Sequence, residues 1–233
     1  MCGRFDQNQP TEKYLDALNL PSVLMRSQAP TRFNVAPGMY RPVLHAGGES
    51  GAHLVDDLHW GYQASWAVGK VPVTINTRLE KITGKYWSRL LKTGRAIVAV
   101  DGWYEWTGEK GNKQPWHIHR ATKAPVFMAA LGGFGNFSDN NKATAGFTII
   151  TADALGGMVD VHDRRPVVLS AQDAILWMDP ALPPAAAEQL ARTQALGPQA
   201  FAWHQVTRAV GSVRNDGPEM AEPVDTDEHG SGN

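Results

Sequence analysis

The sequence predicts an α+β fold: a single domain with a curved, mainly antiparallel β core and peripheral helices. Three observations support this prediction. Short β-like runs are numerous, helical patterns interrupt them only here and there, and polar Gly- and Asn-containing stretches separate neighbouring runs as hairpin loops do. Many short strands with scattered helices are typical of an antiparallel sheet that carries its helices on the outside. A chain of 233 residues suits one domain with a substantial core.

The expected strands are short runs of apolar or alternating residues, rich in β-branched and aromatic side chains. They cover residues 41–45, 53–60, 71–75, 96–100, 103–106, 115–120, 126–131, 147–151 and 201–206. Three polar stretches between such runs are expected to be surface turns because they combine Gly with Asn, Ser, Glu or Lys. These turns cover residues 46–51, 107–113 and 135–142.

Helices are expected where apolar residues recur at helical spacing. This pattern occurs over residues 11–20 and 85–92. Ser170, with Asp173 three residues later, is typical of a helix N-terminus. A further helix is expected over residues 183–195, because proline is well suited to the first turn of a helix.

Composition and charge narrow the classes of function that this protein can have. The net charge is -1 and the isoelectric point about 6.7, so nucleic-acid binding would need a local basic patch. One cysteine excludes an intramolecular disulfide and argues against a cysteine-based metal site. The chain shows neither a signal-peptide pattern nor an apolar run of about 18 residues. We therefore expect a cytoplasmic monomer without membrane contact, with one domain at residues 1–224 and a disordered tail at 225–233.

Cys2 is the first candidate for chemistry. If Met1 is removed, Cys2 carries a free amine and a thiol on adjacent carbons. Such an aminothiol can attack an aldehyde through nitrogen to give an imine, and sulfur can then close a five-membered thiazolidine ring. An amine pKa of about 8 and a thiol pKa of about 8.5 leave some of each nucleophile at neutral pH. The alternative is an ordinary second residue, but Gly3, Arg4 and Phe5 favour an N-terminus docked into the fold.

Two further segments contain candidates for proton transfer. Glu105 lies in the run VDGWYEW, where strand alternation places it on the face of Trp103. A carboxyl group among aromatic side chains is a candidate for a raised pKa. His162 and Asp163, in the run DVHDRRP, form a candidate acid–base pair followed by two arginines suited to phosphate. The alternatives are an ordinary strand Glu and a solvated loop that precedes a strand at 166–169.

Other polar residues could contact a ligand. Asn76 and Arg78 share one face of a predicted strand, and Trp66 precedes them; aromatic rings interleaved with arginines suit base stacking and phosphate contacts. The alternative is an edge strand with polar residues turned outward. His117 and His119 alternate on a strand and could pair on one face. We interpret them as a satisfied histidine pair, and we expect neither a metal nor a cofactor.

A set of short motifs occurs in a distinctive order along the chain. They are MCGRF (1–5), NVAPG (34–38), WGY (60–62), INTRLE (75–80), DGWYEW (101–106), HDRRP (162–166) and VTRAVGSVRN (206–215). Together they resemble the SRAP family, the SOS-response-associated peptidase-like proteins that process abasic sites. The resemblance extends from Cys2 to about Val224, and MCGRF and the DGWYEW–HDRRP combination are its most specific parts.

The resemblance implies a single domain with a mixed, barrel-like β core and a positively charged cleft for single-stranded DNA. It also implies roles for individual residues. Cys2 matches the family's nucleophile, and Asn76 matches an Asn that supports the linkage to DNA. Glu105 matches an acid–base residue, and His162 matches a His placed for proton transfer at the opened sugar. The positions expected to bind DNA are Arg4, Arg78, Arg164 and Trp66.

The implied activity is covalent capture of abasic sites in single-stranded DNA by Cys2. The sequence departs from the usual family pattern at Ala64, Thr77 and Arg165, where Pro, Ala and Met are common; the first two departures affect the expected shape of the DNA wedge. Two other functions stay open. One is a thiol peptidase that releases Met1, and the other is a non-covalent module that binds single-stranded DNA.

Overall fold

The computed structural model describes the chain except for residues 1, 21, 48–51, 135–144 and 225–233. The expected turn at 135–142, the expected tail at 225–233 and most of the turn at 46–51 lie outside the described residues. The domain boundary at 224 therefore stays a prediction. No helix in the described part of the chain has the length and apolar character needed to cross a bilayer.

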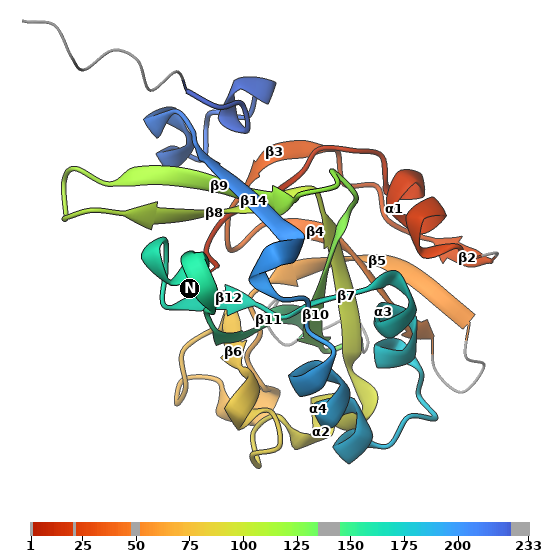
Figure 1. Ribbon diagram of the computed structural model, residues 1–233. Helices are drawn as coiled ribbons and strands as arrows, with labels where there is room; N and C mark the ends of the chain where they lie inside the picture. Colours follow the sequence, from red (N-terminus) through yellow and green to blue (C-terminus); the bar gives the residue numbers. More distant parts are fainter. Residues whose placement is uncertain (1, 21, 48–51, 135–144, 225–233) are drawn as a thin grey trace, which may run out of the picture.

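Strands provide most of the regular structure, and the helices lie around them (Figure 1). The strands are β1 (Phe5–Gln7), β2 (Val23–Met25), β3 (Arg32–Val35), β4 (Tyr40–Gly47), β5 (Ala52–Trp60), β6 (Asn76–Arg78), β7 (Arg95–Val100), β8 (Gly102–Thr107), β9 (Gln114–Arg120), β10 (Val126–Gly132), β11 (Gly146–Asp153), β12 (Arg164–Pro166), β13 (Val168–Leu169) and β14 (Phe201–Gln205). The α-helices are α1 (Thr11–Leu18), α2 (Ser88–Thr93), α3 (Ala171–Met178) and α4 (Pro184–Thr193).

The described strands form two sheets. One has the order β14-β9-β8-β1-β3 and is antiparallel throughout. The other follows β12-β11-β10-β7-β4-β5-β2, and β11 also pairs with β5. That pairing closes β5, β4, β7, β10 and β11 into a ring, beside which the first sheet lies (Figure 1). The predicted single α+β domain with mainly antiparallel strands and peripheral helices is confirmed, with a ring-closed sheet rather than a complete barrel.

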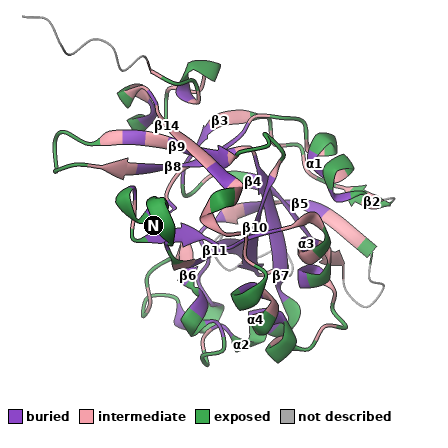
Figure 2. Ribbon diagram, in the orientation of Figure 1, coloured by how far each residue is buried: buried purple, intermediate pink, exposed green. Residues whose placement is uncertain are grey.

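The core lies on both faces of the central strands. Every residue of β7 and β10 is buried, as Figure 2 shows. Successive side chains of a strand point to opposite faces, so Ile97 joins the core under the helices while Val98 packs with Phe5 and Trp60. Burial on both faces explains why residues 96–100 of β7 form an unbroken apolar run.

Local chemistry explains the helix boundaries. Ser170 Oγ accepts the backbone N–H of Asp173 at 3.1 Å, which confirms the predicted start of α3. Pro184 opens α4, where its missing N–H costs no helical hydrogen bond. Helix α1 ends at Leu18, and the next residue, Asn19, has the left-handed backbone (φ 53°) that is typical of a helix C-terminus. The expected helix at 85–92 is shorter than predicted and becomes α2.

One predicted strand is wrong. Residues 71–75 form no strand; only Thr74 makes an isolated bridge, to Tyr62. Pro72 lacks the N–H that a sheet ladder needs, and regular pairing begins at Asn76. The structure also contains short strands that periodicity did not predict, because three or four residues carry too little alternation. These are β1, β2, β3 and β12.

Strand pairing brings the predicted site segments together. Strand β1 lies between β3 and β8, with Phe5 opposite Trp103 and Asp6 opposite Gly102. Strand β6 pairs with β11, which in turn pairs with β12. The backbone of β8 needs Gly102, because a Cβ there would lie 2.4 Å from His117 Nε2.

Candidate active site

Cys2 is docked inside the protein. It has no exposed surface, and it leads into β1, where Phe5 packs on Trp60 with ring centroids 4.7 Å apart. The docking predicted from Phe5 is confirmed. Burial, with the nearby carboxylate of Glu105, raises the pKa of the Cys2 thiol far above its ordinary value. The thiol is therefore protonated at neutral pH.

Asn76 holds the backbone of Cys2. The side chain comes from the first residue of β6, and its Nδ2 donates to the Cys2 carbonyl oxygen at 2.7 Å. Its Oδ1 is buried and has no hydrogen-bond partner among the described residues. Asn76 thus fixes Cys2 through one end of the amide and presents an acceptor at the other.

Glu105 supplies a buried carboxyl group. It lies on β8 with 2% of its surface exposed, and burial raises its pKa from 4.5 to about 7. A carboxyl group with a pKa near neutrality can both give and take a proton under physiological conditions. The predicted raised pKa of Glu105 is confirmed in direction, and its cause is desolvation.

His162 lies next to Glu105. Its Nε2 is 3.8 Å from Glu105 Oε2. Its Nδ1 accepts the backbone N–H of Arg164 at 2.9 Å, although the Asp163 carboxylate also lies 2.6 Å from the same nitrogen. The backbone amide can only donate, whereas Asp163 is largely exposed, so we assign the ring proton to Nε2, toward Glu105. Burial lowers the pKa of His162, which favours the neutral ring.

Four elements therefore converge on one small site. A thiol, a carboxamide, a carboxyl group and an imidazole come from the segment before β1, from β6, from β8 and from the segment before β12. The site residues predicted at Cys2, Asn76, Glu105 and His162 lie together, linked by the contacts above. The arrangement offers a nucleophile, a fixed acceptor and two groups that can transfer protons.

The predicted DNA-binding arginines differ in their surroundings. Arg78 is exposed on β6. Arg4 is half-buried: its Nη1 donates to Asn34 Oδ1 at 2.7 Å and to the Val210 carbonyl at 3.1 Å, and its guanidinium lies 6.0 Å from the Trp106 ring centroid.

Arg164 is already neutralised by protein carboxylates. Its Nη1 lies 3.1 Å from Glu80 Oε1 and 2.5 Å from Asp153 Oδ1, and its Nη2 donates to the Thr151 carbonyl at 2.8 Å. Trp66, in the 3₁₀ helix Ser65–Ala67, is 62% exposed. Arg78 and Trp66 are thus open to a ligand, whereas Arg164 is held by the protein.

Asn34 holds the surroundings of Arg4, although the sequence did not single it out. Its Nδ2 contacts the carbonyl oxygens of Val210, Ser212 and Asn215, and its Oδ1 accepts from Arg4. The NVAPG and VTRAVGSVRN motifs therefore meet around Arg4. The occurrence of an Asn within a short motif was the available signal, but its carbonyl partners lie more than 170 positions away.

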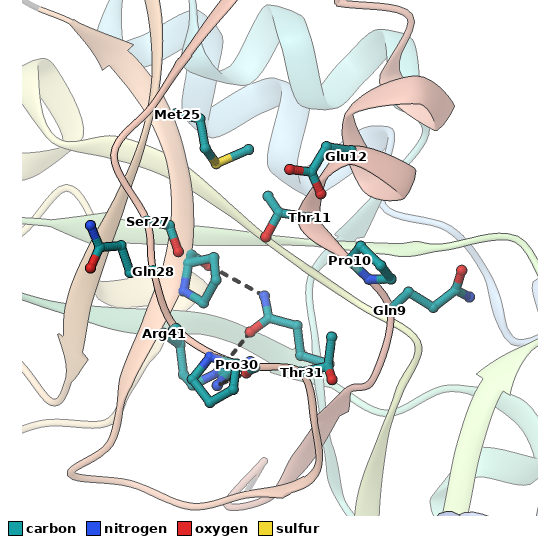
Figure 3. A pocket seen from close by; sticks show the side chains of 13 residues that line it. Gln9, Pro10, Thr11, Glu12, Met25, Ser27, Gln28, Pro30, Thr31 and Arg41 are labelled. Atoms are coloured by element: carbon teal, nitrogen blue, oxygen red, sulfur yellow. Dashed lines mark hydrogen bonds between the residues drawn. The ribbon is translucent and has the colours of Figure 1, made fainter.

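A separate polar pocket lies between α1 and the segment that joins β2 to β3 (Figure 3). Here Arg41 Nε donates to Gln7 Oε1 at 2.8 Å, and Gln7 Nε2 donates to the Pro42 and Ala99 carbonyls. Burial lowers the pKa of Arg41 to about 10. The predicted site residues do not line this pocket, and its hydrogen bonds tie β1 to β4 and β7.

The raised pKa of Glu105 predicts a pH-dependent stability. A carboxyl group whose pKa is raised on folding stabilises the fold while it is protonated, and this contribution is lost as the pH rises from 4.5 to about 7. The difference between these two pKa values corresponds to about 3 kcal/mol of the free energy of unfolding. Glu105→Gln cannot ionise, so its free energy of unfolding should fall less than that of the wild type between pH 5 and pH 8. Urea unfolding at both pH values measures this; equal falls in the two proteins would contradict the prediction.

Known proteins match the chain over most of its length. The SOS response associated peptidase (SRAP) family model matches residues 1–213. Abasic site processing protein YedK of Escherichia coli is 41% identical over 229 residues, which cover 96% of this chain and 100% of that protein. Abasic site processing protein HMCES of Gallus gallus is 29% identical over 238 residues, covering 88% of this chain and 70% of that protein.

A solved structure agrees with the sequence matches. A phage-related protein of Bordetella bronchiseptica superposes with a TM-score of 0.76 and 38% sequence identity, covering 89% of this chain and 95% of that one. The family model, the relatives and the fold are consistent with one another. The chain therefore belongs to the SRAP family.

Proposed function

We propose that this protein processes abasic sites in single-stranded DNA by capturing them covalently through Cys2 after Met1 is removed. The observation that supports the proposal is the placement of Cys2, which Asn76 holds by its carbonyl beside Glu105. The names of YedK and HMCES, which describe abasic site processing, support the same substrate. Because all these groups come from one chain, we propose that the protein acts as a monomer.

The proposed reaction starts from the open aldehyde of an abasic sugar. The free amine of Cys2 attacks C1′, and loss of water gives an imine. The Cys2 sulfur then bonds to C1′, its proton passes to nitrogen, and a thiazolidine ring closes. The ring consumes the protonated imine that would otherwise promote loss of the 3′ phosphate, so capture protects the strand from cleavage.

The raised pKa of the thiol fits this order of steps. A protonated thiol is a poor nucleophile, so nitrogen reacts first and sulfur follows within the held geometry. In this proposal Glu105 gives a proton to the hydroxyl group that leaves as water, and His162 assists ring opening of the sugar. Asn76 keeps Cys2 in position.

We propose that the DNA strand runs past β6. Arg78 is exposed there, and the preceding segment exposes Trp66 (62%), Val68 (47%) and Val73 (47%). An exposed aromatic ring and an exposed guanidinium group suit base stacking combined with phosphate contacts. The family resemblance also assigns Arg4 and Arg164 to DNA. Their guanidinium groups would contact DNA while also keeping hydrogen bonds within the protein.

The phosphate contacts can be measured through salt dependence. Arg78→Ala should lower the slope of log affinity against log salt for single-stranded DNA by roughly 0.7, because one released counterion contributes about that much. Intact and abasic strands should weaken about equally. Arg26→Ala removes an exposed arginine that pairs with Asp56 and is the matched control, with an unchanged slope expected.

We expect Arg4→Ala and Arg164→Ala to lower the salt slope and to weaken binding in the same way. Circular dichroism verifies that each variant folds. If folded variants of all three arginines keep the wild-type affinity and slope, the DNA path proposed here is wrong.

A denaturing gel with matched abasic and intact oligonucleotides tests the proposed function. We expect a heat-stable adduct on the abasic strand alone. An intact abasic strand without adduct, but with ordinary binding, would favour a non-covalent DNA-binding module. Cleavage of generic peptides without any dependence on the aldehyde would favour a thiol peptidase.

A further inference from the structure

Three histidines gather outside the site described above. His117 and His119 lie two residues apart on β9, so they point to one face of the sheet, and His204 on the neighbouring β14 is the Cα partner of His117. One ring nitrogen of each lies within 4.8 Å of the others. The three ring centroids are 5.4–5.5 Å apart.

The second nitrogen of each ring is engaged by an acceptor. His117 Nε2 donates to Asp6 Oδ1 at 3.0 Å. His119 Nδ1 donates to the Arg120 carbonyl oxygen at 2.8 Å, and His204 Nε2 donates to the Ala221 carbonyl oxygen at 2.9 Å. A carboxylate or carbonyl on the far nitrogen is the arrangement that fixes the tautomer of metal-binding histidines.

These hydrogen bonds leave a lone pair on the other nitrogen of each neutral ring. The nitrogens with the lone pair are His117 Nδ1, His119 Nε2 and His204 Nδ1. Lys123 Nζ lies 3.1 Å from His119 Nε2 and donates to it, which independently requires a lone pair there. The three rings therefore present acceptors, and an acceptor cluster attracts a cation.

His117 Nδ1 is a buried nitrogen that makes no hydrogen bond to the described residues. The residue is only 5% exposed. Leaving a buried polar atom unpaired costs about 1–3 kcal/mol. Strand β8 makes room for this ring, because only a glycine at position 102 avoids contact with His117 Nε2.

We propose that His117, His119 and His204 bind a divalent transition-metal ion, with Zn²⁺ the best fit. Neutral imidazole is a preferred ligand of zinc, and three histidines leave a fourth tetrahedral position for water. Zn–N bonds of about 2.0–2.1 Å need ligand atoms closer than those seen here, so the rings turn inward on binding. The Lys123 ammonium withdraws from His119, which its place on the exposed surface allows.

The metal would join elements that are distant in sequence. It links β9 to β14 directly, and the hydrogen bond from His117 to Asp6 extends the link to β1, which leads back to Cys2. A bound ion stabilises the fold in proportion to the logarithm of its concentration above the dissociation constant. We therefore expect Zn²⁺ to raise the melting temperature of the protein.

Titration of tag-free protein with Zn²⁺ and with Co²⁺ tests the proposal. Isothermal titration should show one Zn²⁺ per chain, and Co²⁺ should give tetrahedral ligand-field bands in the visible spectrum without thiolate-to-metal charge transfer. Cys2→Ala should bind equally well, which excludes chelation by the N-terminal aminothiol. His204→Gln should weaken Zn²⁺ binding by at least about 100-fold, since even loss of an outer partner costs 10–100-fold.

Two further variants serve as controls, because neither of them removes a proposed metal ligand. His53→Gln changes a half-buried histidine on β5, outside the cluster, and should bind as the wild type does. Lys123→Ala removes the competing ammonium and should tighten binding. Wild-type affinity in a folded His204→Gln, charge transfer that disappears in Cys2→Ala, or no Zn²⁺ binding by the folded wild type would each overturn the proposal.

Discussion

Cys2→Ala is expected to lose the crosslink that survives heat and denaturant without a reductant. The alanine variant keeps the amine once Met1 is removed, so it still forms an imine with the abasic aldehyde. It has no sulfur to close the ring, and imines hydrolyse. The adduct should therefore survive denaturation only after borohydride reduction. Denaturing gels with and without borohydride measure the loss, which we expect to be nearly complete.

The same variant should damage the DNA that the wild type protects. A protonated imine acidifies the neighbouring C2′ position, so the abasic strand should be nicked. A protein with an extra residue before Cys2 is the matched control, because it keeps the thiol but blocks the amine. It should form no heat-stable adduct without a reductant, since its thiol gives only a labile hemithioacetal and the amine of the extra residue gives only an imine. An unreduced, heat-stable crosslink from Cys2→Ala would contradict the role of sulfur.

Glu105→Gln and His162→Ala should each slow adduct formation by on the order of 10²-fold, the usual contribution of a positioned acid or base. Affinity for undamaged single-stranded DNA should barely change, because neither residue is proposed to hold phosphate. Single-turnover crosslinking rates and binding isotherms provide the two measurements. Glu109→Gln, on the exposed turn of the same hairpin, is the matched control.

The pH dependence identifies the form of Glu105 that acts. If the protonated carboxyl group gives up the proton, its contribution declines as the pH rises through about 7. The ratio of the wild-type rate to the Glu105→Gln rate should therefore narrow above that pH. Equal losses of binding and crosslinking in the Gln variant would instead mean that Glu105 is structural.

Much of the framework could be predicted because its determinants are local. The apolar runs of β7 and β10, the Ser170 cap and the Pro184 start of α4 are all set by neighbouring residues. Strands of three residues, such as β1, could not be predicted, since only pairing with distant partners makes them strands. The expected strand at 71–75 failed because Pro72 prevents regular pairing there.

The residues of the candidate site could be predicted from the sequence, but the contacts between them could not. Motif resemblance gave Cys2, Asn76, Glu105 and His162, yet nothing local shows that the Asn76 amide holds the Cys2 carbonyl 74 positions away. The burial that raises the pKa of Glu105 depends on tertiary packing. His204 joins the β9 histidines only through the pairing of β14 with β9, which periodicity cannot place.

Mass spectrometry of the digested adduct tests the central claim most directly. Trypsin should release the peptide that ends at Arg4, without Met1, carrying the abasic sugar with loss of one water. An imine and a thiazolidine have the same mass, but only the imine leaves a thiol, and Cys2 is the one cysteine of the chain. We predict that the wild-type peptide resists alkylation by iodoacetamide. A sugar-bearing peptide that still contains Met1, that carries the sugar on a lysine, or that alkylates fully would contradict capture by both nucleophiles of Cys2.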